Sequence, residues 1–264
     1  MSGDFINAMA LHLILLLIGA GVIAGIIATM IGGGAVVLYP ALLFSGVPPN
    51  LAVVCILASV APAAMLGALS DHSQLPPFNR AFLGLILTSV IGAGVGASLL
   101  LLTPERMFAQ LMPLLIGFAT LLFAKSERIS AWLRARAADR GHDITFNVAS
   151  LKVLLPVSFY GGYFGAGVGI MMLGVFSLAT GGDYRSANVA KNFVASLNGM
   201  TATVIFATHG AVLWPQTLVL MAGTIVGGLI GAYVARVISP RVVRVLIVFV
   251  GAGLTVALAR RYWF

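Results

Sequence analysis

Two glycine clusters are the first residues in this sequence whose type and spacing could bind a ligand. Gly32-Gly33-Gly34 follows one apolar run, Gly165, Gly167 and Gly169 follow another, and each cluster precedes an apolar piece of only about 10 to 12 residues. Glycine permits positive φ and frees backbone N–H groups, so each cluster predicts the N-terminus of a half-length helix. The helix dipole makes such an end attractive to anions. The alternative is that these glycines only let helices pack closely.

A polar stripe in the second half is the other candidate for ligand binding. Asn188 and Asn192 are i, i+4 neighbours, Lys191 lies beside them, and Ser196 follows four residues later among apolar residues. Lys191 could bind an anion or extend back to the cytoplasmic interface, and the sequence leaves both open. An amide facing lipid would lack partners, so the asparagines are expected to face protein or a wet cavity. We predict one substrate site that combines this stripe with both glycine clusters.

Enzyme chemistry finds little support in the remaining residues. All seven acids lie at segment ends or in loops, and no HExxH, GxSxG or paired-acid motif occurs. The single cysteine, Cys55, excludes a disulfide framework and a cysteine-ligated metal centre. We therefore expect no catalytic residues, no metal site and no cofactor. The absence of a carboxylate in mid-membrane also argues against a proton or sodium relay.

The composition identifies the class of protein that must hold these residues in place. Of 264 residues, 60% are apolar and only 8% are charged, against about 25% charged in soluble domains. The sequence therefore predicts an all-α polytopic membrane protein embedded in the lipid bilayer. The net charge of +8 comes from cations at helix ends and in one loop, which is typical of topology signals and not of a nucleic-acid-binding face.

The order of apolar runs predicts an internal repeat of two halves. Each half contains one span, a glycine break, a short piece and three further spans, and a shift of 134 residues superimposes the two breaks. This gives a first transmembrane repeat at 1–125, a basic cytoplasmic linker at 126–147 with a short amphipathic helix, and a second transmembrane repeat at 148–264. The predicted runs are Leu11–Ile31, Ala35–Phe44, Leu51–Leu69, Ala81–Leu102, Met107–Ala124, Val148–Phe164, Val168–Ala179, Ala187–Ala207, Leu218–Ile238 and Val242–Ala259.

The distribution of Lys and Arg predicts how the halves are oriented. More cations fall on the linker side when each Gly-broken pair enters and leaves the membrane on one side, and the positive-inside rule favours that arrangement. Each half then makes an odd number of crossings, so the two repeats are inverted, as in many transporters. Whether each pair is a re-entrant hairpin or two short crossings stays open, because both have the same parity.

Several motifs are similar to one known family. GGGAVVLYPALLFSGVPPNLA in the first half, YGGYFGAGVGIMMLGVFSLATGGDYRSANVAKNFVASLNG in the second and the later HGAVLWPQ resemble the TauE/SafE sulfite exporters over essentially the whole chain. The resemblance implies a multi-pass bacterial inner-membrane carrier of a small sulfur-containing anion such as sulfite or sulfoacetate, usually an exporter. The first half departs from the family pattern by having Val54-Cys55-Ile56, which argues for an asymmetric site.

Two alternatives to this interpretation follow from the same residues. The chain could be a membrane assembly or scaffold protein in which the glycines serve packing and the basic linker docks a partner. The glycine seams, such as Gly92 with Gly96, could equally serve packing within one chain or a homodimer.

Overall fold

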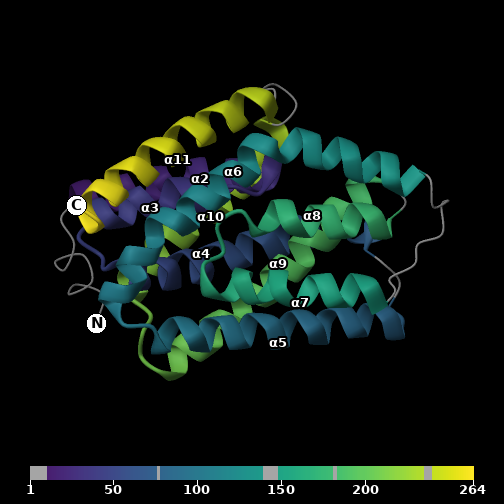
Figure 1. The fold of residues 1–264 in the computed structure, drawn as a ribbon, viewed down its shortest axis with the longest axis horizontal. Coiled ribbons are helices and arrows are strands. Elements are labelled where there is room, and N and C mark those ends of the chain that lie inside the picture. The colour runs from purple at the N-terminus through teal and green to yellow at the C-terminus, as the bar shows by residue number, and fades with distance from the viewer. Residues whose placement is uncertain (1–10, 76–77, 139–147, 181–182, 235–239) are drawn as a thin grey trace.

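The chain folds entirely into helices and turns within the residues that the computed structural model describes, which are 11–75, 78–138, 148–180, 183–234 and 240–264. Some of the long helices lie along the long axis of the molecule and others cross it obliquely (Figure 1). In chain order the elements are α2 (Leu11–Ile31), α3 (Ala35–Phe44), α4 (Pro49–Leu69), the 3-10 helix η1 (His72–Gln74), α5 (Arg80–Leu102), α6 (Glu105–Ala138), α7 (Val148–Tyr163), α8 (Val168–Ala179), α9 (Tyr184–Thr208), α10 (Trp214–Val234) and α11 (Pro240–Tyr262).

The structure confirms the predicted all-α membrane fold. Six helices in the described residues are long and apolar enough to cross a membrane: Leu11–Thr29, Pro49–Leu69, Arg80–Leu102, Glu105–Ile129, Trp214–Gly231 and Val242–Tyr262. Large apolar side chains on the outer faces, such as Leu87, Ile91 and Phe249, are more than half exposed. Exposed rows of this kind are the surface that lipid covers.

Most helix limits lie within a few residues of the predicted runs, and one helix is longer than expected. α2, α3 and α8 begin and end at the predicted residues. α6 instead continues to Ala138, so the first part of the predicted linker extends a membrane helix and does not form a separate short one. Residues 139–147, the rest of that linker, lie outside the described ranges.

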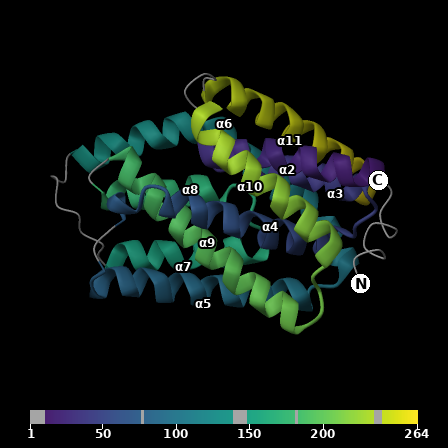
Figure 2. The ribbon, with the colours of Figure 1, turned by 180° about the vertical axis from the view of Figure 1, so that it is seen from behind.

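The main helix contacts join one half of the chain to the other. α2 packs along α10 and α7 packs along α5, while α4 contacts α9 and α6 contacts α11. Matching the halves in chain order pairs α2 with α7, α4 with α9, α5 with α10 and α6 with α11. Under this matching the contact of α2 with α10 corresponds to that of α7 with α5, and the α4–α9 and α6–α11 contacts each join two matched helices. Figures 1 and 2 show the pairs α5–α7 and α6–α11 from opposite sides of the molecule. The inversion of one repeat relative to the other stays a prediction. Two inverted repeats packed against each other would produce symmetric contacts of this kind.

Glycines make the closest of these helix contacts. A Cβ on Gly25 of α2 would lie 2.3 Å from the carbonyl oxygen of Thr224 in α10, and one on Gly96 of α5 would lie 2.1 Å from that of Phe159 in α7. No larger side chain fits at such backbone distances. The seams of Gly92–Gly96 and Gly223–Gly227 therefore hold helices together within this chain.

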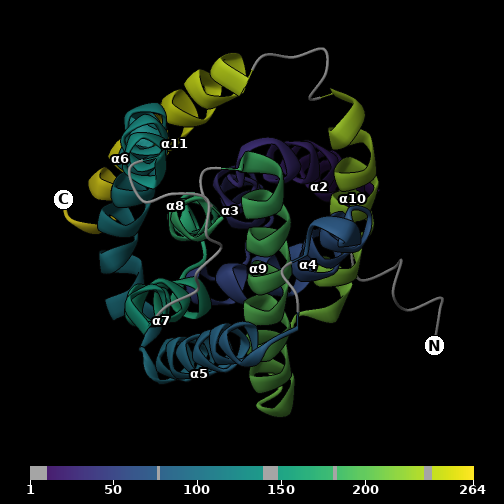
Figure 3. The same ribbon diagram turned by 90° about the vertical axis from the view of Figure 1, so that its right-hand side faces the viewer.

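The two glycine breaks meet inside the bundle. Figure 3 looks along the long axis and places α3 and α8 near the middle, with α5, α6, α10 and α11 toward the outside. Gly32 (φ 82°) ends α2 and Gly165 (φ 79°) ends α7, each donating its N–H to a carbonyl five residues earlier. These equivalent glycines are 133 residues apart, one fewer than the shift used in the sequence alignment. After the first break, Gly34 packs against Ala24, so α3 starts back alongside α2.

Candidate functional site

A cavity of about 100 Å³ lies where the two breaks meet α4 and α9. Four glycines of the breaks line it, together with Lys191 and Asn192 of α9 and small or aliphatic side chains of α4. This volume accommodates several waters or a small polyatomic ion. The lining residues are Ala28, Gly32, Gly34, Ala35, Ile56, Leu57, Val60, Ala61, Ala64, Gly165, Val168, Gly169, Lys191, Asn192, Ala195 and Gly199.

One wall of the cavity is formed by direct contact between the two breaks. A Cβ built on Gly169 would lie 3.1 Å from the carbonyl oxygen of Gly32, and one built on Gly32 would lie 3.3 Å from the Cα of Gly169. The two main chains therefore touch with no side chain between them. Gly32 also has positive φ, a conformation that favours glycine independently of the space around it.

Among the residues that the structure describes, Lys191 is the only cation that lines this cavity. The residue is 3% exposed, and its Nζ atom lies 3.8 Å from the place where a Gly32 Cβ would stand. The side chain thus points inward and does not extend back to the interface. Within the described residues no hydrogen bond or ion pair engages it. An ammonium group buried without a counter-ion is costly, and an anion in the cavity would lower that cost.

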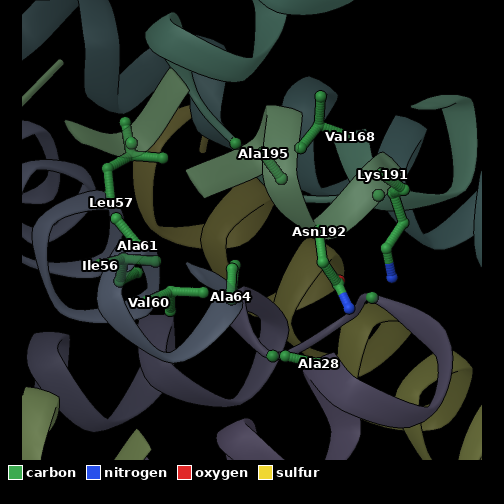
Figure 4. A pocket seen from close by; sticks show the side chains of 16 residues that line it. Ala28, Ile56, Leu57, Val60, Ala61, Ala64, Val168, Lys191, Asn192 and Ala195 are labelled. Atoms are coloured by element: carbon green, nitrogen blue, oxygen red, sulfur yellow. The ribbon is translucent and has the colours of Figure 1, made fainter. Parts of the chain in front are cut away.

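Asn192 extends its amide beside Lys191. Figure 4 shows both side chains reaching from α9 toward the segment that carries Ala28. Asn192 is 8% exposed, and its Nδ2 lies 3.4 Å from the position of a Cβ on Gly67 in α4. The amide therefore contacts the glycine face of α4 and presents a neutral hydrogen-bond donor next to the ammonium group.

Backbone donors complete the polar lining. The N–H groups of Gly34 and Gly169 have no hydrogen-bond partner among the described residues, and both glycines line the cavity. The N–H of Gly32 is different, because it donates to the carbonyls of Ile27 and Ala28 at 3.2 and 3.0 Å. Gly32 therefore allows the two main chains to approach closely, while the first turns of α3 and α8 supply the unpaired N–H donors.

Four residues of the predicted site lie outside this cavity wall. Gly33 faces Phe123, whose ring carbon would lie 2.7 Å from an added Cβ, and Gly167 (φ 80°) faces Ala119. Asn188 lines a second cavity nearer the end of α9, and its Oδ1 is buried without a partner. Ser196 is fully buried, its Oγ has no partner, and it lines neither cavity.

Small residues of α4 and α9 belong to the cavity although their types gave no chemical signal. Ala61 and Ala64 line it from α4, and Gly199 lines it from α9, where a Cβ would lie 2.7 Å from that of Ala61. Their common property is size. The one signal in the sequence is the run of small residues in α4 opposite the polar stripe of α9, which indicates close contact between the two helices.

A separate polar cluster joins α9 to α5 and α7. Asn198 accepts a hydrogen bond from Ser89, and Ser89 is 3.1 Å from Ser158. All three side chains are buried, and none of them lines the cavity. We assign this cluster to helix packing.

Acidic residues stay away from the cavity in the described part of the chain. Asp71 lies between α4 and α5, Glu105 begins α6, and Asp183 caps α9 by accepting hydrogen bonds from the N–H groups of Arg185 and Ser186. Hydrogen bonds from Ser186 hold the pKa of Asp183 below its usual range. No group of three or more potential metal ligands occurs in these residues.

Comparison with known proteins gives a consistent set of matches. The family model Sulfite exporter TauE/SafE matches residues 17–258. A "probable membrane transporter protein ORF9" of a Sinorhizobium species is 28% identical, over 95% of this chain and 94% of its own length. A "probable membrane transporter protein" of Haemophilus influenzae is also 28% identical, over 94% of each chain. YunE of Bacillus subtilis, with the same description, is 25% identical over 90% of this chain and 96% of its own. No solved structure matches significantly.

Proposed function

The chain belongs to the TauE/SafE sulfite exporter family of membrane transporters, and from this premise we propose that it carries a small sulfur-containing anion, such as sulfite or sulfoacetate, out of the cell across the bacterial inner membrane. The substrate binds in the cavity between the two glycine breaks. Lys191 supplies the positive charge, Asn192 donates a neutral hydrogen bond, and the unpaired N–H groups of Gly34 and Gly169 complete the set of donors.

The observation that carries this proposal is the inward-facing ammonium group of Lys191. It is buried, it has no partner among the described residues, and it lies beside unpaired backbone donors in a cavity of suitable size. Apart from the amide oxygen of Asn192 and the main-chain carbonyls, the polar groups that line this cavity are hydrogen-bond donors. An oxyanion, which has several acceptor atoms, is the complementary ligand. A neutral or cationic solute would leave the ammonium group unpaired.

Lys191→Gln in purified protein reconstituted into liposomes tests the proposal directly. Efflux of sulfite, sulfoacetate and sulfate is compared with that of a neutral solute, and Lys125→Gln on the exposed face of α6 serves as the matched control. Loss of a charged hydrogen bond of about 1.5 to 3 kcal/mol should weaken apparent affinity by about 10- to 150-fold. Because Lys191 is buried, the effect should persist at high salt. Anion efflux no faster than from empty liposomes rejects the proposed function.

The coupling mechanism follows from the absence of an acidic partner. Asp71, Glu105, Glu127 and Asp183, the described acids, lie at or near the ends of membrane helices, so none of them can relay protons at the cavity. Either the anion leaves alone down the membrane potential, or it carries its own proton. A potential of 100 mV contributes about 2.3 kcal/mol per charge, enough for roughly a fiftyfold concentration ratio.

A further inference from the structure

Three cavities follow one another along α9, and Asn192 lines all of them. The central cavity holds the proposed substrate site. A neck cavity of about 30 Å³ and an outer cavity of about 250 Å³ lie beyond it. The neck shares Ala28, Val60, Ala64 and Asn192 with the central cavity, and Thr29, Ala63, Gly67 and Asn192 with the outer one.

We propose that this row of cavities is the route by which substrate reaches the central site, and that the side chain of Asn192 is the barrier in it. The inference rests on the proposed function for the identity of the substrate, a small oxyanion. It adds a direction of access, an outer vestibule and a residue that controls passage between the vestibule and the site.

The walls of the neck explain why one side chain can close it. On the α4 side the neck is lined by Ala63, Ala64 and Gly67 together with Val60. The other lining residues are Gly25, Ala28 and Thr29 of α2, Thr224 of α10 and Asn192 of α9. The room that remains is enough for about one or two waters. The Asn192 amide lies 3.4 Å from the Cβ position of Gly67, where α4 has no side chain, so the volume of the passage at this point depends on where the amide stands.

The outer cavity opens at the end of the molecule where α9 begins. It includes Ser70 and Asp71 after α4, and Arg185, Asn188 and Val189 on the first turns of α9. Arg185 forms a two-point ion pair with Asp71, with Nε 2.6 Å from Oδ2 and a second nitrogen 2.9 Å from Oδ1. Ser186 donates to Gln74 at 2.9 Å across the same gap. These contacts fix the width of the vestibule by joining α9 to the turn after α4.

Buried aromatic rings pack together near the start of α4, where the Tyr39 hydroxyl donates a hydrogen bond to the carbonyl of Pro49, and this is the end of α4 away from Asp71 and Arg185. Tyr39, Phe108 and Phe164 are at most 1% exposed. The ring centroids of Tyr39 and Phe164 are 5.6 Å apart, and those of Phe108 and Phe164 are 6.4 Å apart. Phe164 directly precedes Gly165, which lines the central cavity. The row of cavities, by contrast, leads from the central cavity toward Arg185.

Cysteine labelling tests the route without requiring transport. Cys55 is the only cysteine, so Cys55→Ala gives a cysteine-free background into which single cysteines are introduced. Ser70→Cys marks the face of the vestibule, and Val60→Cys, which lines both the neck and the central cavity, reports passage inward from the vestibule. Oriented vesicles are treated from each side with a sulfonate-bearing methanethiosulfonate, an anion that does not cross lipid, and with its trimethylammonium analogue. Each variant is first checked for a single monodisperse species in detergent.

The expected result is that Val60→Cys reacts from the same face as Ser70→Cys and faster with the anionic reagent, because Lys191 lies on the inner side of the barrier. Adding Asn192→Ala should raise the labelling rate at Val60→Cys about tenfold, a lowering of the barrier by about 1.4 kcal/mol, because removal of the amide widens the neck. Thr208→Ala, which changes the far end of the same helix and lines none of the three cavities, should leave that rate unchanged.

Three outcomes would overturn the route. They are labelling of Val60→Cys only from the face opposite Ser70→Cys, a rate that does not respond to Asn192→Ala, and no labelling of Val60→Cys while Ser70→Cys reacts. Flux measured in parallel separates the two proposals. If labelling follows the expectation but no anion flux is found, the proposed function fails and the route remains.

Discussion

Gly169→Ala adds one methyl group at the contact between the two glycine breaks. The φ of Gly169 is not positive, so alanine is tolerated by the backbone and the only new feature is the volume of Cβ. That atom would lie 3.1 Å from the carbonyl oxygen and 3.2 Å from the Cα of Gly32. Both neighbours are backbone atoms, so relief requires the break at Gly32 or the start of α8 to shift. We expect loss of stability together with loss of transport.

The cost of the added methyl group at Gly169 can be measured against a control substitution at another helical glycine. Gly253→Ala in α11 adds the same methyl group where no other atom lies within 4 Å. Both changes gain roughly 0.5 to 1 kcal/mol of backbone entropy and helix propensity, and that gain cancels in the difference. The remaining difference is the cost of overpacking, about 1 to 3 kcal/mol. In a protein of this size that corresponds to a gap in Tm of roughly 2 to 12 °C between the variants.

Thermal unfolding in detergent, followed by anion efflux from liposomes, measures both consequences. We expect Gly169→Ala to melt below the wild-type protein and Gly253→Ala to melt at or above it. Transport should fall in Gly169→Ala even when assayed well below its Tm, because the shift deforms the cavity wall. The reasoning is refuted if the two variants have equal melting temperatures, or if Gly169→Ala transports normally.

Three further predictions follow from contacts elsewhere in the structure. Asp183→Ala should lower the free energy of unfolding by about 0.5 to 2 kcal/mol by removing the α9 cap. Because the native pKa of Asp183 is lowered, the difference from wild type should begin to shrink as the pH falls below about 4, the ordinary Asp value, and should be lost once the pH falls through the lowered native pKa, which melting curves across pH check. Thr224→Val should cost about 0.5 to 1.5 kcal/mol by removing the hydrogen bond of 2.8 Å to the carbonyl of Ser59, whereas an unchanged Tm would show that this bond between α10 and α4 contributes nothing. Anion efflux should follow an imposed membrane potential and continue without sodium, and flux that requires a sodium gradient would contradict the coupling proposed above.

The helices and their interruptions could be predicted because the membrane imposes strong limits on sequence. A spanning segment must be apolar along its whole length, so the limits of α2, α3 and α8 were visible in the composition alone. The extension of α6 to Ala138 was not visible. Beyond Ala124 the helix leaves the apolar stretch, and the polar residues that follow are compatible with either helix or loop.

The site was predicted only in part, because the rotation of each helix about its axis is set by tertiary packing. Asn188, Asn192 and Ser196 look like one stripe, but each step of four residues advances by about 40° around the helix. Asn188 therefore lines the outer cavity, Asn192 lines the central one, and Ser196 is turned into the protein. In the same way, neighbouring glycines face different surroundings, with Gly32 against Gly169 and Gly33 against Phe123.

The alanine lining of the central cavity has a consequence for how carriers of this kind could diverge. The breaks form one wall with main chain alone, so that wall cannot change its shape without losing the contact between Gly32 and Gly169. The facing wall is built from methyl groups, including those of Ala61, Ala64 and Ala195. Exchanging one methyl group for a hydroxymethyl or a branched side chain would alter the size and polarity accepted while the charged end of the site stays fixed. Under the proposed function, selectivity among small anions could thus change through single substitutions while the fold is retained.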